Sequence, residues 1–299
     1  MTASLRLSVP DLANPADRDA YFAVVDAAAD ADGAAAFDEQ TRLDLAAGRR
    51  APWAARDASG AMRAVAVLGG GALDLVVAPD ARGRGVGRQT LSALLEEVPR
   101  GALTAWSHGD HPGAHRLAAR FGFTAARSLL GMRLMLDGAA HPAAPPHGFS
   151  LDRFRPGRDD AEWVGLNQRT FASHPEQGRM TAADLHDRMA EPWFDAGDFL
   201  VLRDPDGRMV GYDWLKVGGD DQAGEIYVLG VDPGLSGRGL GRVLLMAGLA
   251  RLGERGCREA ALYVEGDNDA ALWLYRSAGF AVSSTDVQYR RSSPVYPGP

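Results

Sequence analysis

A short loop of glycine and arginine occurs twice in this chain, in the same context each time. Residues 80–88 read DARGRGVGR and residues 234–242 read GLSGRGLGR. The glycines at 83, 85 and 87 recur at 237, 239 and 241, and Val77 and Pro79 recur at the same offset. A fixed offset kept over a whole motif indicates an internal duplication. The chain is therefore expected to fold as two similar units.

The surroundings of both loops follow one order of secondary structure. An apolar or β-branched run precedes each loop, LDLVVAP at 73–79 and EIYVLGVDP at 225–233, and a stretch with helical apolar spacing follows it. A second apolar run, a polar turn, a short helical stretch and a Gly-Phe pair complete each copy. This order predicts an α/β fold with a mixed sheet in each half.

The segment 138–148, GAAHPAAPPHG, is rich in Pro, Ala and Gly and has no periodicity, which is typical of a linker. We therefore expect a first domain over 1–140, a linker over 141–148 and a second domain over 149–299. A chain of 299 residues with 46% hydrophobic content is large enough for two globular domains. In the second, Asp206-Gly207 between two apolar runs predicts a hairpin turn.

Composition limits the partners and the compartment. The net charge is −7, and no basic stripe or interleaving of aromatic and basic residues indicates nucleic-acid binding. No apolar run reaches membrane-spanning length, and the first residues lack the pattern of a secretion signal. Because Cys257 is the one cysteine, no internal disulfide can form. We expect a cytoplasmic monomer without membrane or nucleic-acid partners.

The repeated loop offers main-chain N–H groups at the start of a helix. Glycine lets a backbone approach a ligand closely, and a helix N-terminus carries about half a positive charge, so the loop suits a pyrophosphate. Arg84 and Arg238 would add charge. No GK[ST] follows, and the glycine spacing is not that of the dinucleotide fingerprint. The alternative, a tight turn that needs glycine for geometry alone, is weakened by the second copy.

The pattern V-x-P-x-x-R-G-x-G-x-G at 77–87 resembles the coenzyme A-binding motif of the GCN5-related N-acetyltransferases, the GNAT superfamily. GVDPGLSGRGLG matches it with Ser236 in place of the usual first Gln or Arg, and LYVEGDNDAALWLYRSAGF (262–280) resembles that family's later, Asn-led helix. The resemblance implies two tandem GNAT domains with splayed central strands, acetyl-CoA as cosubstrate and no metal.

The resemblance also implies a set of acetyl-CoA contacts in each repeat. In the second they are Leu229, Gly230, Val231, Ser236, Gly237, Arg238, Gly239, Leu240, Gly241 and Arg242, then Asn268, Asp269, Ala270, Ala271, Leu272 and Trp273. In the first they are Leu75, Val76, Val77, Gly83, Arg84, Gly85, Val86, Gly87 and Arg88.

Three segments, EIYVLGVDPGLSGRGLG, LYVEGDNDAALWLYRSAGF and FASHPEQG, are similar to one tandem branch of the superfamily. That branch acetylates the cysteinyl amine of 1-D-myo-inositol 2-(L-cysteinylamino)-2-deoxy-α-D-glucopyranoside, a cysteinyl-glucosaminyl-inositol. The resemblance implies acceptor contacts from Glu39, Glu176, Lys216, Glu225 and Tyr263. Carboxylates would pair with the ammonium, and Lys216, the one lysine of the chain, would donate to oxygen atoms. A solvated strand end is the alternative for Lys216.

Acetyl transfer from a thioester to an amine needs a base for the ammonium, a donor to the carbonyl oxygen and an acid for the leaving thiolate. Glu225, on the strand before the loop, is expected to be the base, and Tyr275, four residues before Gly279, the acid. A main-chain N–H within 229–231 would polarise the carbonyl. A solvated strand-edge charge is the alternative for Glu225, and ordinary packing is the alternative for Tyr275.

The duplication separates the roles of the two halves. The counterparts of Glu225 and Tyr275 in the first repeat are Gly71 and Ala118, which can handle no proton. The catalytic domain is therefore expected over 149–299. The first domain would bind a nucleotide-like ligand without turnover or support the architecture.

Other functions stay open at this point. The chain could acetylate another small amine, such as an aminoglycoside or an amino acid, or it could be a non-catalytic acyl-CoA-binding module. His108, His111 and His174 lack the spacing of a helix-borne ligand pair, so no metal site is expected.

Overall fold

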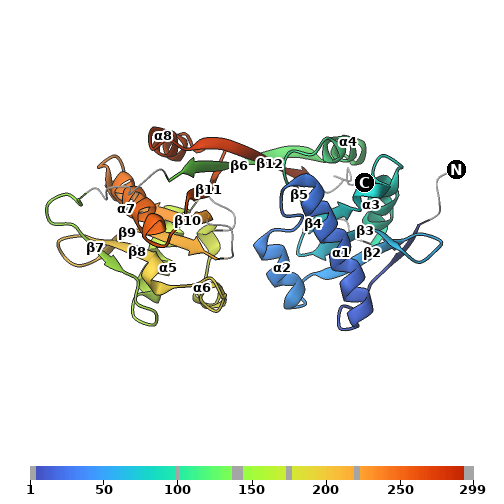
Figure 1. Ribbon diagram of the computed structural model, residues 1–299, viewed down its shortest axis with the longest axis horizontal. Coiled ribbons are helices and arrows are strands. Elements are labelled where there is room, and N and C mark those ends of the chain that lie inside the picture. Colours follow the sequence, from blue (N-terminus) through green and yellow to red (C-terminus); the bar gives the residue numbers. More distant parts are fainter. Residues whose placement is uncertain (1–4, 98–100, 137–143, 173–176, 219–222, 293–299) are drawn as a thin grey trace, which may run out of the picture. The chain divides into compact units, whose positions relative to one another are not determined.

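The computed structural model describes residues 5–97, 101–136, 144–172, 177–218 and 223–292. The chain divides into two compact units, residues 1–129 with 284–299 (unit 1) and residues 130–283 (unit 2). Each unit holds a mixed sheet with helices packed on it (Figure 1). The predicted α/β fold with two units is confirmed.

Unit 1 contains the first glycine loop. Its strands lie in the order β1 (Arg6–Ser8), β2 (Ala51–Arg56), β3 (Met62–Gly69), β4 (Ala72–Val77), β5 (Leu103–Ser107) and then β12 (Ala281–Arg291). Its helices are α1 (Pro15–Asp32), α2 (Glu39–Ala46), α3 (Val86–Glu97) and α4 (Pro112–Phe121). One apolar cluster joins α1 to Val65 and Val67 of β3, and another joins α3 to Ala66, so helices cover both faces of the sheet.

Unit 2 repeats this plan. Its strands lie in the order β6 (Thr124–Met135), β11 (Glu259–Glu265), β10 (Ala223–Val231), β9 (Met209–Val217), β8 (Phe199–Arg203) and β7 (Ser150–Arg153). Its helices are α5 (Asp160–Thr170), α6 (Ala182–Met189), α7 (Leu240–Glu254) and α8 (Asp269–Ser277). Short 3-10 turns lie at Gln177–Arg179, Ala196–Asp198 and Pro233–Leu235, and unit 1 has one at Pro79–Ala81. The predicted hairpin turn joins β8 to β9, with Gly207 at φ +79°.

Alternation along β9 decides which face of unit 2 each side chain occupies. Tyr212 and Trp214 pack with α5 and α6 in an aromatic cluster, where Trp214 stacks on Phe199 with ring centroids 4.5 Å apart. Leu215 faces the other way, into a cluster with α7 and α8. The two faces of this sheet therefore carry different chemistry.

The compact units do not coincide with the two repeats of the sequence. Strands β6 and β12 each contribute residues to both units, so the last strand of the chain, from Ser284, belongs to unit 1. Val287 and Arg291 of β12 lie opposite Ser107 and Leu103 of β5. The boundaries at 140 and 149 remain a prediction about the repeats, and part of the expected linker lies outside the described residues.

Candidate functional site

The central feature of the site is an opening between β10 and β11. Their parallel ladder pairs 223–226 with 259–262, and the strands then part. On its other edge β10 stays paired with β9 as far as Val231, and Asp232 donates its main-chain N–H to the Val210 carbonyl at 2.8 Å. The alternation of an antiparallel ladder then points the main-chain groups of Leu229 and Val231 away from β9, into the opening. The predicted splay is confirmed.

The loop after β10 leads from this opening to α7. Gly237 and Gly239 have φ of +76° and +77°, a region that strains other residues, and a β-carbon at either would meet no atom within 4 Å. Gly239 is the N-cap of α7 and makes no side-chain capping bond, so the first-turn N–H groups suit an anion. Ser236 and Arg238 are exposed, as is Arg242 one turn further on.

The third glycine of the loop acts differently. A β-carbon at Gly241 would lie 3.4 Å from Leu274 of α8 and 3.9 Å from Val231. This position therefore brings α7 close to α8, and Leu240 beside it is buried. Of the predicted acetyl-CoA contacts, those in the loop line an open surface, whereas Leu240 anchors the helix.

The loop of unit 1 has the same construction. Gly83 and Gly85 have φ of +72° and +82°, and β4 pairs with β5 at one position, Ala72 with Thr104. Ala78 donates to the Arg63 carbonyl at 3.0 Å, which points the main chain at 75 and 77 away from β3. Arg84 and Arg88 are exposed, and Val76 is buried. The backbone of this loop thus repeats the geometry found in unit 2.

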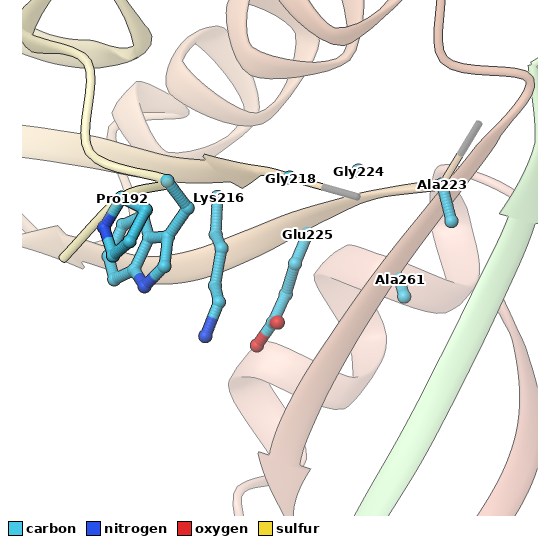
Figure 2. A pocket seen from close by; sticks show the side chains of 8 residues that line it. Pro192, Lys216, Gly218, Ala223, Gly224, Glu225 and Ala261 are labelled. Atoms are coloured by element: carbon cyan, nitrogen blue, oxygen red, sulfur yellow. The ribbon is translucent and has the colours of Figure 1, made fainter. Parts of the chain in front are cut away.

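A pocket of about 430 Å³ adjoins the start of β10. It is lined by Pro192, Trp193, Lys216, Gly218, Ala223, Gly224, Glu225 and Ala261. Glu225 lies opposite Lys216 on the neighbouring strand, and Figure 2 shows both side chains extending in the same direction. The structure thus brings together the predicted base and one predicted acceptor contact. Sequence reasoning missed Trp193, whose one signal was an aromatic residue in the segment EPWFDAGD.

Tyr275 lies elsewhere. It is 7% exposed and packs in the cluster on the α7 and α8 side of the sheet, edge to face with Phe280 at 5.9 Å. Glu225 alternates with Ile226 of that cluster and so points to the other face. Burial raises the pKa of the Tyr275 phenol, which therefore carries a proton at neutral pH. The structure does not place Tyr275 in the lining of the Glu225 pocket.

The other predicted contacts are spread over several elements. Asn268 is the N-cap of α8, where its side chain accepts from Ala271 N at 3.1 Å. Asp269, Ala270 and Trp273 of its first turns are exposed, Ala271 is half-buried, and Leu272 is buried. Tyr263 of β11 is 56% exposed. Glu39 is the first residue of α2 in unit 1, and Glu176 lies outside the described residues, as does His174.

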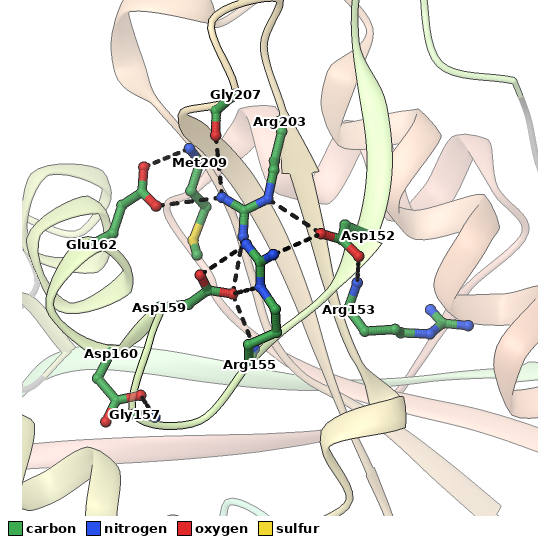
Figure 3. Close-up of polar contacts among 10 residues, drawn as sticks. All are labelled: Asp152, Arg153, Arg155, Gly157, Asp159, Asp160, Glu162, Arg203, Gly207 and Met209. Carbon is green, nitrogen blue, oxygen red and sulfur yellow. Dashed lines mark hydrogen bonds and ion pairs between the residues drawn. The ribbon is translucent and has the colours of Figure 1, made fainter.

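An ion network holds the start of α5 against the β8–β9 hairpin (Figure 3). Arg203 donates to Asp159 at 2.9 Å and to the Gly207 carbonyl at 3.2 Å, and Glu162 accepts from Met209 N at 2.7 Å. Burial favours the protonated carboxyl of Asp159, but its bonds from Arg155 and the nearby Arg203 outweigh this and lower its pKa. These elements border a second pocket of about 480 Å³ that reaches the loop at Asp232, Gly234 and Leu235.

The histidines of unit 1 have local partners. His111 is the N-cap of α4, and His108 Nδ1 lies 2.9 Å from Asp286 of β12. Within the described residues, His, Cys, Asp and Glu side chains form no group of three or more that could hold a metal ion. No helix in the described part of the chain is long and apolar enough to span a bilayer.

Known proteins share sequence with both repeats. The sequence model of the acetyltransferase (GNAT) family matches residues 35–123 and 163–280, one match in each repeat. A mycothiol acetyltransferase of Clavibacter michiganensis is 49% identical over 270 residues, which cover 87% of both chains. That of Thermobispora bispora is 45% identical over 290 residues, which cover 93% of this chain and 97% of its own.

Two solved structures share the fold. A GCN5-related N-acetyltransferase from Sphaerobacter thermophilus superposes with a TM-score of 0.73 at 23% identity, covering 99% of this chain and 97% of that one. A tandem GNAT protein from the clavulanic acid biosynthesis pathway superposes with a TM-score of 0.75 at 19% identity, covering 98% and 100%. At these identities the likeness concerns the architecture.

Proposed function

This chain belongs to the acetyltransferase (GNAT) family, and from that premise we propose that unit 2 acetylates the cysteinyl amine of cysteinyl-glucosaminyl-inositol, the last step of mycothiol biosynthesis. The observation that carries the proposal is the position of Glu225 opposite Lys216 on the neighbouring strand, both lining a pocket beside the opening of β10. The resemblance to a mycothiol synthase and the relatives named mycothiol acetyltransferase support this acceptor.

The loop at 236–242 suits the pyrophosphate of acetyl-CoA. Its left-handed glycines turn main-chain N–H groups outward and leave no side chain in front of them. The opening between β10 and β11 then offers the N–H groups of Leu229 and Val231 to the thioester. Main-chain donors aimed at a developing oxyanion are typically the largest single contribution to catalysis of this kind.

Glu225 takes the proton of the acceptor ammonium in this proposal. The free amine then attacks the thioester carbonyl carbon, the carbon–sulfur bond breaks, and the products are an amide and coenzyme A thiol. In this proposal the buried phenol of Tyr275, which keeps its proton at neutral pH, donates that proton to the sulfur as it leaves. The proton that the nitrogen loses when the amide forms then returns to the phenolate. No covalent enzyme intermediate is needed.

The remaining assignments belong to the acceptor and to unit 1. Lys216 donates to hydroxyl or carbonyl oxygens of the acceptor, and Glu39, Glu176 and Tyr263 are its further contacts. Unit 1, with Gly71 and Ala118 at the matching positions, binds a nucleotide-like ligand without turnover or supports the architecture. We place the enzyme in the cytoplasm and expect a monomer, which size-exclusion chromatography with light scattering would test.

Two substitutions test the catalytic assignment. Glu225→Gln and Tyr275→Phe should each lower turnover by about 100- to 10,000-fold, because each removes a general acid–base group. Release of coenzyme A thiol from acetyl-CoA, with cysteinyl-glucosaminyl-inositol as acceptor, gives the rate. Glu254→Gln, at the exposed end of α7, and Tyr289→Phe in unit 1 are matched controls that should keep wild-type rates.

A panel of aminoglycosides and amino acids tests the acceptor. A higher kcat/KM on any of these amines would replace the proposed acceptor. Wild-type rates for both Glu225→Gln and Tyr275→Phe would refute the catalytic assignment. Acetyl-CoA binding in a calorimeter without thiol release on any acceptor would indicate a binding module instead.

A further inference from the structure

The Lys216 ammonium lies over two neighbouring aromatic rings. Its Nζ lies 4.8 Å from the ring centroid of Trp193 and 5.5 Å from that of Tyr227. Both distances are within the roughly 6 Å over which a ring face attracts an ammonium group. We propose that Trp193 and Tyr227 are positioning residues that hold the Lys216 ammonium beside Glu225 for recognition of the acceptor. This inference rests on the proposed function.

The two rings are themselves fixed by neighbours. Their centroids lie 5.0 Å apart, and Trp214 packs on both, at 5.7 Å from Trp193 and 5.4 Å from Tyr227. Arg188 of α6 donates from Nε to the Tyr227 hydroxyl at 3.0 Å. Groups from α6, from β9 and from the rings themselves thus fix the two rings that lie beside Lys216.

A β-bulge places Tyr227 in this arrangement. Ile226 lies opposite Leu215 and Val228 lies opposite Trp214, so Tyr227 is an extra residue in β10. Because of the bulge, both Tyr227 and Val228 contribute to the aromatic cluster on the face that Glu225 occupies. Bulges commonly re-aim side chains next to active sites.

The arrangement suits a polyhydroxyl acceptor. A ring face attracts a cation through its quadrupole, and an ammonium group has three N–H donors, so contact with the rings is compatible with donation to oxygen atoms of a ligand. A lysine side chain has four rotatable bonds, and ordering it before binding removes part of the entropic cost of recognition. Loss of a ring should therefore weaken acceptor binding more than the chemical step.

Ring-removing and ring-keeping variants separate this role from packing. Trp193→Leu and Tyr227→Leu should each raise KM for cysteinyl-glucosaminyl-inositol by about 3- to 30-fold, with less than about twofold change in kcat and in KM for acetyl-CoA. Trp193→Phe and Tyr227→Phe keep a ring and should stay within about threefold of wild type. The Trp193 indole N–H has no hydrogen-bond partner among the described residues, so the Phe variant loses none there.

Phe194→Leu is the control for packing alone. Phe194 follows Trp193 in the sequence and contacts Trp214 edge to face at 5.8 Å, but its ring is not one of the two over Lys216. It should destabilise the cluster to a similar degree and leave KM for the acceptor unchanged.

A second readout does not depend on activity. Because Lys216 is the one lysine, ε-13C lysine labelling gives a single side-chain NMR signal. Ring currents should shift its Hε protons upfield in wild type and in Phe194→Leu. The shift should fall by about half or more in Trp193→Leu.

The outcomes separate the two proposals. If wild type does not acetylate cysteinyl-glucosaminyl-inositol, the proposed function fails, and the NMR shift still reports whether the rings hold Lys216. If wild type is active but Trp193→Leu behaves like Phe194→Leu in KM and in chemical shift, the positioning role is overturned.

Discussion

At the scale of single residues, two buried carboxylates of unit 2 contrast. Asp198 is fully buried but paired with Arg251 and Arg255. Asp213 of β9 is also fully buried, and neither of its oxygens has a hydrogen-bond partner in the described part of the chain. It packs against Gly248 of α7, where an added β-carbon would lie 2.1 Å from Oδ2. Burial raises the pKa of Asp213, so its carboxyl keeps the proton to a higher pH than an exposed carboxyl does.

Asp213→Asn should stabilise unit 2 at neutral pH. The unfolded carboxyl ionises near pH 4, whereas the native one keeps its proton, so wild type loses stability as the pH rises above about 4. This loss is about 1.4 kcal/mol for each pH unit until the native carboxyl ionises. The unfolding free energy of the variant lacks this dependence on pH. Urea unfolding should therefore give equal stability for variant and wild type at pH 4 and a more stable variant at pH 7.

Asp198→Asn is the matched control for that measurement. It should lose stability at pH 7, because it removes a carboxylate that two guanidinium groups pair with. A loss for Asp213→Asn at pH 7 would mean that Asp213 is ionised and has a partner.

At the scale of secondary structure, the site depends on where strands stop pairing and helices begin. β10 leaves β11 after Ile226 and continues along β9 to Val231, where the loop turns into α7. On the opposite face, α5 is held by Arg203, whose side chain is 10% exposed and pairs with the nearly buried Asp159. The network of Arg203 and Asp159 therefore fixes the helix that borders the second pocket, the one that reaches the loop at Asp232.

Arg203→Met should destabilise unit 2 by about 3 kcal/mol, the low end for a broken buried pair, because Arg155 remains beside Asp159. Urea unfolding followed by tryptophan fluorescence would measure the loss. Arg169→Met, from an exposed pair with Asp232, should cost less than about 1 kcal/mol. Equal losses for the two variants would contradict a buried, structural role for Arg203.

At the scale of the whole molecule, the last strand of the second repeat, β12, belongs mostly to unit 1. The strand that completes the second repeat pairs with β5 of unit 1 from Val287 to Arg291. Asp286 of the same strand accepts from Gly109 N at 2.9 Å, and Tyr289 is buried in a cluster of unit 1. Unit 1 is therefore completed by residues at the end of the second repeat.

Truncation after Ser283 should raise amide exchange in β5, at 103–107, far more than in β10, because β5 loses its antiparallel partner. Hydrogen exchange with mass spectrometry gives both values in one experiment. Truncation after Ser292, which keeps all of β12, is the control and should leave the exchange of β5 near wild type. Comparable protection of β5 in the two truncations would disprove this assignment of the strand.

The sequence by itself determined the features that depend on local backbone conformation. The glycines of both loops need positive φ, and the strand before and helix after them follow from the spacing of apolar residues. Their repetition predicted two units, and the resemblance of the loops to a known motif implied the family and the splayed strands. The comparison of the repeats also pointed to Glu225, which lines a pocket together with Lys216.

Tertiary structure decided what depends on contacts between distant segments. Trp193 meets Lys216, 23 positions away in the sequence, because a strand and a loop converge on one face of the sheet. The burial of Asp213, the face on which Tyr275 packs and the pairing of β12 with β5 likewise depend on which strands become neighbours. The periodicity of apolar residues predicts whether a segment is a helix or a strand and which of its faces is apolar. Which strands pair is set by the packing energy of the whole sheet.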